Sequence, residues 1–294
     1  MARRRSAACA SLGARERAAA RGGGGRLNAY ADDLELAIAT AKAAGSVLLR
    51  HFEHDLDVTT KSSAIDLVTD ADRAAEEVII ARLQRERPDD GILAEESGSI
   101  AGGGRRWIVD PLDGTTNFAH RFPHWSVSIA LWEGEQPLVG VVHDALRNET
   151  FSASFDGGAY LDSPRHDHQR VTVTTAPDLQ SSLLATGFSY GIATAEVTNV
   201  PELAAILPRV QGIRRAGSAA LDLAYVAAGR VDGYWEYALA PWDWAAGVLL
   251  VREAGAEIAT IEDTTWSLTA KSIVVAGPVL FPRMLEVLRA AAVS

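Results

Sequence analysis

Apolar positions in the first part of the chain recur at a helical spacing. From Asp33 onwards they return every three or four residues, which predicts an amphipathic helix with one buried face. That face comprises Leu34, Ile38, Ala41, Gly45, Leu48 and Phe52. A second helix is expected from about Asp70 to Arg87, because Pro88 cannot continue it. Its inward positions are Ala75, Val78, Ile79 and Leu83.

Short runs rich in β-branched and aromatic residues predict strands between and after these helices. Val58–Lys61 is expected to be a short strand that leads into a polar loop at Ser62-Ser63. Asp90-Gly91 is typical of a turn, and a short buried strand at Ile92–Ala94 follows it. Trp107–Val109 is expected to be a buried strand. The runs expected to form an antiparallel meander after it are Ser126–Trp132, Pro137–His143, Thr150–Ser154 and Val171–Thr174.

The second half of the chain alternates strands with helices. The expected strands are Ser182–Thr186, Ile213–Arg215, Val231–Glu236, Ala256–Ile261 and Ser272–Ala276. The expected helices are Val200–Leu207, Ser218–Ala228, Asp243–Ala254 and a last helix at the C-terminal end. Because helical and β-rich stretches interleave, the pattern predicts an α/β layered sandwich.

Composition and charge narrow the classes of protein that fit this pattern. The chain has 294 residues, of which 48% are hydrophobic, and a formal net charge of -10. An acidic surface argues against a wide nucleic-acid or anionic-membrane footprint and suits a protein that gathers divalent cations. Cys9 is the single cysteine, so the sequence has no internal disulfide or thiolate metal site, which fits a reducing cytoplasm. No apolar run approaches the roughly 18 residues that span a bilayer.

The first 27 residues differ from the rest, with seven arginines, one acidic residue (Glu16) and the run Gly22–Gly25. We interpret residues 1–27 as a disordered Arg/Ala/Gly-rich tail or the result of a start codon placed too early. A faint similarity to an organelle transit peptide is the alternative. The domain is then expected over residues 28–294, with a metal-binding half at 28–175 that holds the meander and a second α/β half at 176–294.

Two carboxylates follow the apolar run that ends at Val109. Asp110 and Asp113 lie three residues apart, Pro111 stiffens the connection, and Gly114 lets the chain turn back. Both carboxylates are therefore expected at one point beyond the sheet edge, with backbone N–H groups facing it. Carboxylates suit a hard cation and N–H groups suit a phosphate, so the run predicts metal-assisted phosphate chemistry.

Glu95 and Asp243 share this setting, since each lies where an apolar run ends or a helix starts. Three or four carboxylates could serve two Mg²⁺ ions if one of them bridges the pair. Each residue also has a plainer interpretation. Asp113-Gly114 could be an ordinary turn, Glu95-Glu96 a solvated pair, Asp243 the cap of a helix that opens at Trp244, and Asp72 a surface acid.

The two longest motifs together resemble the inositol monophosphatase family. Residues 108–118, Ile-Val-Asp-Pro-Leu-Asp-Gly-Thr-Thr-Asn-Phe, look like its first signature, and residues 241–247, Pro-Trp-Asp-Trp-Ala-Ala-Gly, look like its second. Lys61-Ser62-Ser63, Asp66–Thr69, Glu95-Glu96-Ser97 and Gly217–Ala220 follow the same order. The resemblance covers about residues 30–290 and implies a layered α-β-α-β-α sandwich of the inositol monophosphatase or fructose-1,6-bisphosphatase type.

The resemblance also implies roles for individual residues. A first Mg²⁺ would be held by Glu95, Asp110 and the carbonyl of Leu112. A second Mg²⁺ would be held by Asp110, Asp113 and Asp243. A third ion would lie near Asp72 and Glu95. Thr115 with Glu95 would orient the attacking water, and the N–H groups of Gly114 and Thr115 would receive the phosphate. Gly217, Ser218, Ala219 and Glu236 would line the alcohol side of the substrate together with Asp113 and Asp243, and Lys61 would lie on a loop over the metals.

These roles imply a phosphomonoesterase of the inositol-phosphate phosphatase type that requires Mg²⁺ and is inhibited by Li⁺. The resemblance further implies myo-inositol 1-phosphate as the substrate, a homodimer and a cytoplasmic location. Relatives hydrolyse fructose 1,6-bisphosphate, histidinol phosphate, NADP or 3′-phosphoadenosine 5′-phosphate, so these remain alternatives. Two departures bear on the substrate: residues 142–145 lack a proline after Asp144, and residues 161–164 replace an asparagine-glycine turn. Some bacterial relatives act with the transcription machinery in antitermination, and this is the alternative from another class.

Overall fold

The structure is a computed structural model that describes residues 29–54, 64–189, 191–195, 197–262 and 266–292. The side chains of His54 and of residues 64–69 lie outside this description. The predicted strand Val58–Lys61, the loop at Ser62-Ser63 and the whole of the tail at 1–27 also fall outside the described residues.

The first sheet has eight strands in the order β2-β1-β3-β4-β5-β6-β7-β8. The β1 and β3 strands are parallel, and every other neighbouring pair is antiparallel, which confirms the predicted meander. The bounds of the strands are β1 Gly91–Ala94, β2 Gly98–Ile100, β3 Arg105–Asp113, β4 Ser126–Glu133, β5 Gln136–Asp144, β6 Glu149–Ser154, β7 Gly158–Ser163 and β8 His166–Val171.

The second sheet has five strands in the order β10-β9-β11-β13-β12. The three strands β10, β9 and β11 are parallel, and β13 and β12 are antiparallel to their neighbours. The bounds are β9 Leu183–Thr186, β10 Gly212–Arg214, β11 Gly233–Tyr237, β12 Glu257–Ala259 and β13 Ser272–Ala276.

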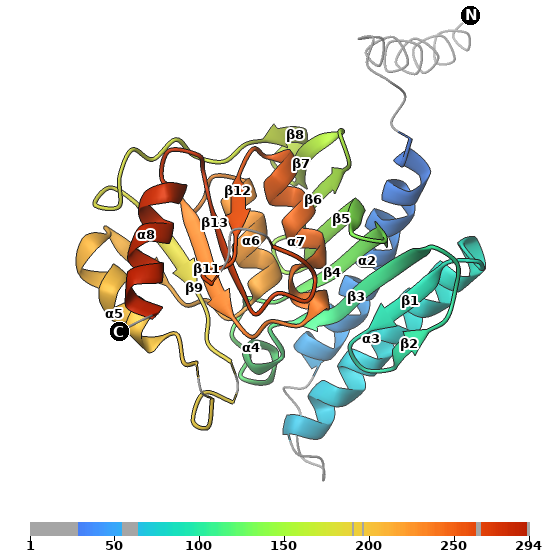
Figure 1. Ribbon diagram of the computed structural model, residues 1–294. Coiled ribbons are helices and arrows are strands. Elements are labelled where there is room, and N and C mark those ends of the chain that lie inside the picture. The colour runs from blue at the N-terminus through green and yellow to red at the C-terminus, as the bar shows by residue number, and fades with distance from the viewer. Residues whose placement is uncertain (1–28, 55–63, 190, 196, 263–265, 293–294) are drawn as a thin grey trace, which may run out of the picture.

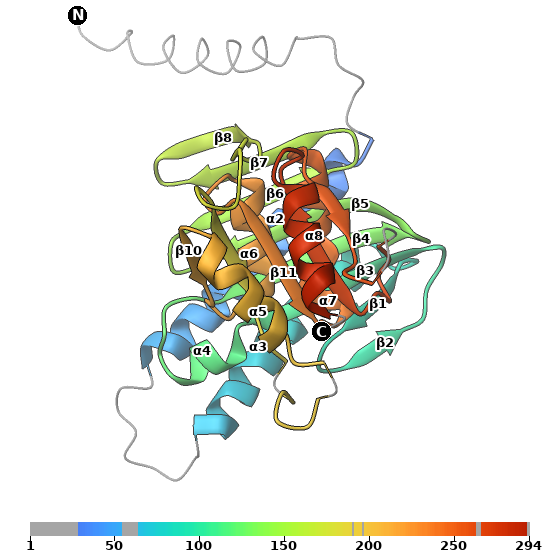
Figure 2. The same cartoon turned by 60° about the vertical axis from the view of Figure 1, so that its left-hand side comes forward.

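Helices lie outside both sheets and between them, so the molecule has five layers (Figures 1 and 2). The α2 and α3 helices cover the outer face of the first sheet, α6 and α7 fill the space between the sheets, and α5 and α8 cover the outer face of the second. Their bounds, with those of the short helices, are α2 Ala31–His54, α3 Ala64–Glu86, α4 Thr115–Ala119, α5 Val200–Ile206, η2 Leu207–Arg209, α6 Ala219–Ala227, α7 Pro241–Glu253 and α8 Phe281–Ala292.

The core is correspondingly divided into three apolar clusters, one at each interface between a sheet and its helices. The largest packs α6 and α7 between the two sheets and contains the fully buried Trp244 and Tyr234. Its burial supplies the main force that holds the sheets together, since buried apolar area contributes about 25 cal/mol per Å². The predicted α-β-α-β-α sandwich is confirmed. The division into halves at residue 175 stays a prediction.

The predicted elements are largely confirmed, with differences at their ends. The predicted face of the first helix has Ala41, Gly45 and Leu48 buried in α2, with Leu34, Ile38 and Phe52 half-buried. The second helix starts at Ala64 and not at Asp70. The sequence pattern did not indicate this start because Ile65, Val68 and Thr69 are β-branched, which lowers helix propensity. Within it Val78 is half-buried, whereas Ala75, Ile79 and Leu83 are fully buried.

Two strand predictions were wrong and two further strands were not predicted. The strand at Trp107–Val109 was expected to end before Asp110, but β3 runs on to Asp113 through an irregular pairing with β4 that accommodates Pro111. Of the predicted strand Val171–Thr174 only Val171 pairs, because Val173 N donates to Ala254 O at 3.1 Å outside the sheet. The short strands β2 and β7 were not expected at all.

Candidate active site

Two carboxylates lie within the last part of β3. Asp110 is 2% exposed, and one of its oxygens accepts a hydrogen bond from the N–H of Leu112 at 2.9 Å. Its pairing with Ser128 is followed by a shift in register, after which Asp113 pairs with Ser126. The irregular stretch between them lets both aspartates lie on the same side of the strand's end instead of alternating.

Glu95 and Asp72 reach the same region from two other elements. Glu95 follows β1, which is parallel to β3, and its N–H donates to Val109 O at 3.3 Å. Asp72 lies on α3 and is 3% exposed, and its Oδ1 atom is buried without a hydrogen-bond partner among the described residues. A buried carboxylate oxygen without a donor is costly unless a cation or water satisfies it.

Asp243 comes from the other side of the site, in the first turn of α7. Its Oδ2 atom accepts a hydrogen bond from Ala240 N at 2.7 Å, so it caps the helix from inside. The helix was expected over Asp243–Ala254, and the structure starts it at Pro241. Proline suits that position because the first helical N–H groups have no partner within the helix. Asp243 therefore serves as a cap and also faces the carboxylates of β3.

Mutual repulsion shows that these carboxylates share one region. The pKa of Asp72 is raised to about 8 by burial and by Glu95. Burial and Asp113 raise the pKa of Asp243 to about 8. The pKa of Glu95 is raised to about 6 by burial, against the effect of a hydrogen bond with Asp110. Burial raises the pKa of Asp110 well above its usual value, with Glu95, Asp113 and Asp243 adding to the shift.

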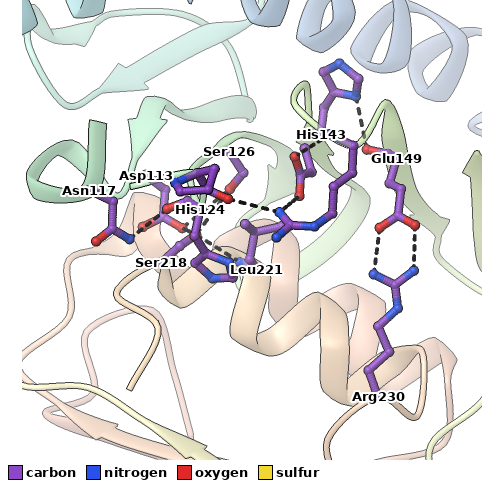
Figure 3. A network of polar contacts seen from close by, with 12 residues as sticks. Asp113, Asn117, His124, Ser126, His143, Glu149, Ser218, Leu221 and Arg230 are labelled. Atoms are coloured by element: carbon purple, nitrogen blue, oxygen red, sulfur yellow. Dashed lines mark hydrogen bonds and ion pairs between the residues drawn. The ribbon is translucent and has the colours of Figure 1, made fainter. Parts of the chain in front are cut away.

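Asp113 is bound at both oxygens by the start of α6. The hydroxyl of Ser218 donates to Asp113 Oδ2 (Figure 3). Ala220 N donates to the same atom at 2.9 Å. Ala219 N donates to Oδ1 at 3.3 Å, and Ser126 lies at 3.5 Å from Oδ2. Burial raises the pKa of Asp113 to about 6, while these donors act in the opposite direction. The carboxylate thereby joins the first sheet to the helix layer.

Asn117 makes a second link between the same two segments. Its side-chain amide donates to His124 O at 2.7 Å (Figure 3). The same amide donates to Ala216 O at 2.8 Å. The turn at Gly114 has a φ of +98°, and a Cβ there would lie 3.0 Å from His124 O and 3.3 Å from Gly217 O. The predicted turn at Gly114 is confirmed, and it needs glycine for its backbone angle and for the lack of space.

Thr115 opens the short helix α4. Its hydroxyl donates to Leu112 O at 3.0 Å, so the hydroxyl proton points to Leu112 and not to Glu95. The carbonyl proposed as a metal ligand and the hydroxyl proposed to orient water are therefore in contact with each other.

A cavity of about 280 Å³ opens beside these carboxylates. The cavity is lined by the residues that the resemblance placed on the substrate side, which are Asp113, Gly217, Ser218, Ala219, Glu236 and Asp243. Glu236 Oε2 accepts a hydrogen bond from Tyr234 at 2.5 Å, and burial raises the pKa of Glu236 to about 7.

Asp222 lines the same cavity and was missed by the sequence analysis. It is 3% exposed, and burial together with Glu236 raises its pKa well above the usual value. The sequence did contain a sign that Asp222 is unusual, because it is the single charged residue between Ala216 and Gly229. Asn117 was quoted only as part of a motif, although it connects two segments of the site. Lys61 lies outside the described residues.

The donor set fits hard cations. Oxygen atoms of carboxylates and a carbonyl are the ligands that Mg²⁺ prefers, and Asp72 has a buried oxygen that still needs a partner. Divalent cations would also relieve the repulsion that raises these pKa values. Over the described part of the chain, no three His, Cys, Asp or Glu side chains already have the arrangement of a metal site. The carboxylates therefore suit Mg²⁺ by their chemistry and their proximity to one another, and their side chains would have to adjust for the ion to bind.

Comparisons with known proteins agree with this arrangement. A family profile described as the inositol monophosphatase family matches residues 30–293. An inositol-1-monophosphatase of Synechocystis is 45% identical over 224 residues, which are 76% of this chain and 76% of that protein. A Nus factor SuhB of Escherichia coli strain K12 is 40% identical over 259 residues, 87% of this chain and 95% of that protein.

Solved structures give the same result. The inositol monophosphatase of Anabaena superposes with a TM-score of 0.79 at 36% identity, covering 88% of this chain and 96% of that chain. Among the helices of the described residues, none has the length and apolar character needed to cross a membrane.

Proposed function

The chain belongs to the inositol monophosphatase family, as its motifs predicted, and on that premise we propose that it hydrolyses small phosphate monoesters with bound Mg²⁺. The observation that carries the proposal is the gathering of carboxylates from four separate elements. Burial raises the pKa values of Asp72 of α3, Glu95 after β1, Asp110 and Asp113 of β3, and Asp243 of α7. Neighbouring carboxylates add to this shift at Asp72, Glu95, Asp110 and Asp243. Such a concentration of buried negative charge is unfavourable without cations.

We assign the ligands as the resemblance implied. Glu95, Asp110 and the carbonyl of Leu112 hold one ion, and Asp110 with Asp113 and Asp243 hold another. Asp72 and Glu95 serve a third, weaker position. When bound, the ions would neutralise the phosphate and make a nearby water more acidic.

The chain's own groups position the substrate and the water in this proposal. The N–H groups of Gly114 and Thr115 lie at the start of α4, where backbone donors have no partner inside the helix, and they receive the phosphate oxygens. The Thr115 hydroxyl turns from Leu112 towards the water, and the carboxylate of Glu95 accepts a proton from that water.

The cavity favours a neutral polyol as the alcohol. Four carboxyl groups line it, those of Asp113, Asp222, Glu236 and Asp243, and Arg215 is the basic residue among the described residues that do so. Carboxyl groups hydrogen-bond vicinal hydroxyls well, whereas a second phosphate group would be repelled. This supports myo-inositol 1-phosphate over fructose 1,6-bisphosphate and NADP. Histidinol phosphate, which carries positive charge, is not disfavoured by this argument.

A panel of substrates tests the proposal. We expect the highest kcat/KM for myo-inositol 1-phosphate, with Mg²⁺ required and EDTA abolishing the activity. Asp110→Asn, which removes the bridging carboxylate, should reduce hydrolysis of every substrate to background. Equal slow turnover of myo-inositol 1-phosphate, fructose 1,6-bisphosphate, histidinol phosphate and NADP would contradict the inositol assignment. Full activity after exhaustive chelation would contradict the metal-dependent mechanism.

The relative in Escherichia coli is named a Nus factor, which favours a second candidate function with the transcription machinery. Pull-down of that machinery by the Asp110→Asn protein would separate this role from catalysis, because a binding role does not need the bridging carboxylate. To the proposed phosphatase function we add the homodimer, the Li⁺ sensitivity and the cytoplasmic location that the resemblance implied.

A further inference from the structure

Glu76 is a buried carboxylate that lies outside the proposed metal ligands. It is 4% exposed and lies four residues after Asp72 on α3, so the two side chains share one face of the helix. That face packs towards the turn that follows β1 and carries Glu95. An unpaired buried carboxylate would be costly, but Glu76 is fully engaged by this turn.

Three donors of the turn point to the two oxygens of Glu76. Glu96 N donates to Oε2 at 3.0 Å. Ser97 N donates to Oε1 at 2.9 Å, and the Ser97 hydroxyl donates to the same atom at 2.5 Å. Both N–H groups belong to residues whose own surfaces are exposed, so the carboxylate is what shields them.

The other side of the turn is held by the first sheet. Glu95 N donates to Val109 O at 3.3 Å, immediately before Asp110 in β3. Glu95 therefore sits between two anchors, a backbone carbonyl of β3 on one side and the Glu76 carboxylate on the other. Of the two, only the Glu76 anchor depends on a side chain.

We infer that Glu76 is a positioning residue, which fixes the Glu95–Ser97 turn so that the Glu95 carboxylate faces Asp110 and Asp72. The inference rests on the proposed metal-dependent function and goes beyond it, because Glu76 touches neither substrate nor metal. Hydrogen bonds to charged groups are the strong ones, and outer partners of metal ligands typically govern affinity. Glu76 holds the backbone of the turn and leaves the ligand side chain free to bind.

The first test measures the anchor in the metal-free, full-length protein. Hydrogen exchange should show that Glu76→Ala removes the protection of the Glu96 and Ser97 amides. A groove of about 530 Å³ borders Glu76, Glu96 and Ser97, so solvent reaches these amides once the carboxylate is gone. Glu77→Ala is the matched control, because Glu77 is the next residue on α3 and is exposed. Unchanged protection in Glu76→Ala would overturn the inference.

The second test measures metal binding by calorimetry with Mn²⁺. We expect Glu76→Ala to weaken binding by about 10- to 100-fold. Glu76→Gln keeps the volume and one acceptor oxygen, so it should lose less affinity and carries the test if the alanine variant does not fold. At saturating metal, KM should stay within about twofold of the wild-type value, since Glu76 lies away from the cavity.

The outcomes separate this inference from the proposed function. Loss of amide protection with unchanged Mn²⁺ affinity would overturn the positioning role and leave the phosphatase proposal intact. Absence of metal binding and of activity in the wild-type protein would defeat the proposed function, whatever Glu76 does to the turn. Loss of protection with weakened metal binding and restored affinity in Glu76→Gln would support the inference.

Discussion

The hydroxyl of Ser218 donates a hydrogen bond to the carboxylate of Asp113, which lies 105 positions earlier in the chain. Asp113 ends β3 in the first sheet and Ser218 caps α6 between the sheets. The bond therefore joins two layers at the edge of the proposed site. It also orients a proposed metal ligand through a residue that the cavity exposes to substrate.

Ser218→Ala should reduce stability. The change removes a donor to a buried carboxylate and the cap of α6, where the Ser218 oxygen accepts from Leu221 N at 3.4 Å. The free energy of unfolding in urea should fall by about 2 kcal/mol, the sum expected for one helix cap and one charged hydrogen bond. Ser126→Ala is the control, because its contact with the same oxygen is 3.5 Å long and weak. An equal loss in both variants would contradict this account.

Gly114→Ala should cost more than glycine replacement elsewhere. Gly114 and Gly255 both have positive φ angles, +98° and +89°, so alanine strains the backbone at both by about 1–2 kcal/mol. Only at Gly114 would the new Cβ also lie 3.0 Å from His124 O, since nothing lies within 4 Å of a Cβ at Gly255. Thermal unfolding should therefore show the larger loss for Gly114→Ala, and activity should fall in that variant alone.

The metal-free protein should lose stability as pH rises. In the folded state the pKa of Asp72 is raised from 3.8 to about 8, so between these values the folded state binds more protons than the unfolded state. Stability is therefore highest below about pH 4 for this group and declines as pH rises to about 8. Mg²⁺ should restore more stability at pH 8 than at pH 5, because binding displaces those protons.

Asp72→Asn checks the sign of this effect. In EDTA the variant should have a higher melting temperature than the wild type at pH 8 and nearly the same one at pH 4, as measured by circular dichroism. Asp70→Asn is the control, because Asp70 lies two residues earlier on the same helix and is exposed. Its melting temperature should equal that of the wild type at both pH values. A variant less stable than the wild type at pH 8 would contradict the assignment of repulsion at Asp72.

Gly187→Ala should alter substrate choice through Glu236. A Cβ at Gly187 would lie 2.0 Å from Glu236 Oε2, so the carboxylate would have to move away from the position in which Tyr234 holds it. We expect kcat/KM for myo-inositol 1-phosphate to fall about tenfold relative to p-nitrophenyl phosphate, the equivalent of one hydrogen bond. Gly191→Ala, with its nearest neighbour at 3.8 Å, should leave this ratio unchanged.

Local patterns predicted those parts of the fold that bury an apolar face. The spacing around Ala41 and Leu48 located α2, and the β-branched runs located most strands of the meander. The strand β8 was placed wrongly because it is an edge strand whose first five residues are exposed, so no alternation marks it. The strand β7, its neighbour, ends in Asp162 and Ser163, which are more typical of a turn.

The site could be predicted as far as its motifs reach. Contiguous signatures singled out Asp110, Asp113 and Asp243, because the residues next to each of them in the chain belong to a recognisable motif. Glu76 and Asp222 were missed, since an acidic residue on a helix is most often solvated and only the packing of that helix shows otherwise. The contact between Thr115 and Leu112 also depends on the three-dimensional path of the turn and could not be read from spacing.

The bridge between Asp113 and the start of α6 has a consequence for synthesis. A ribosome releases the chain from its N-terminus, so the first sheet emerges complete while Ser218 and Asp243 are still untranslated. During that interval Asp113 lacks the amides and the hydroxyl that later surround it, and water or protons must occupy their place. The set of carboxylates at the candidate site is therefore completed late in synthesis, when the helix layer that carries Ser218 and Asp243 docks on the first sheet.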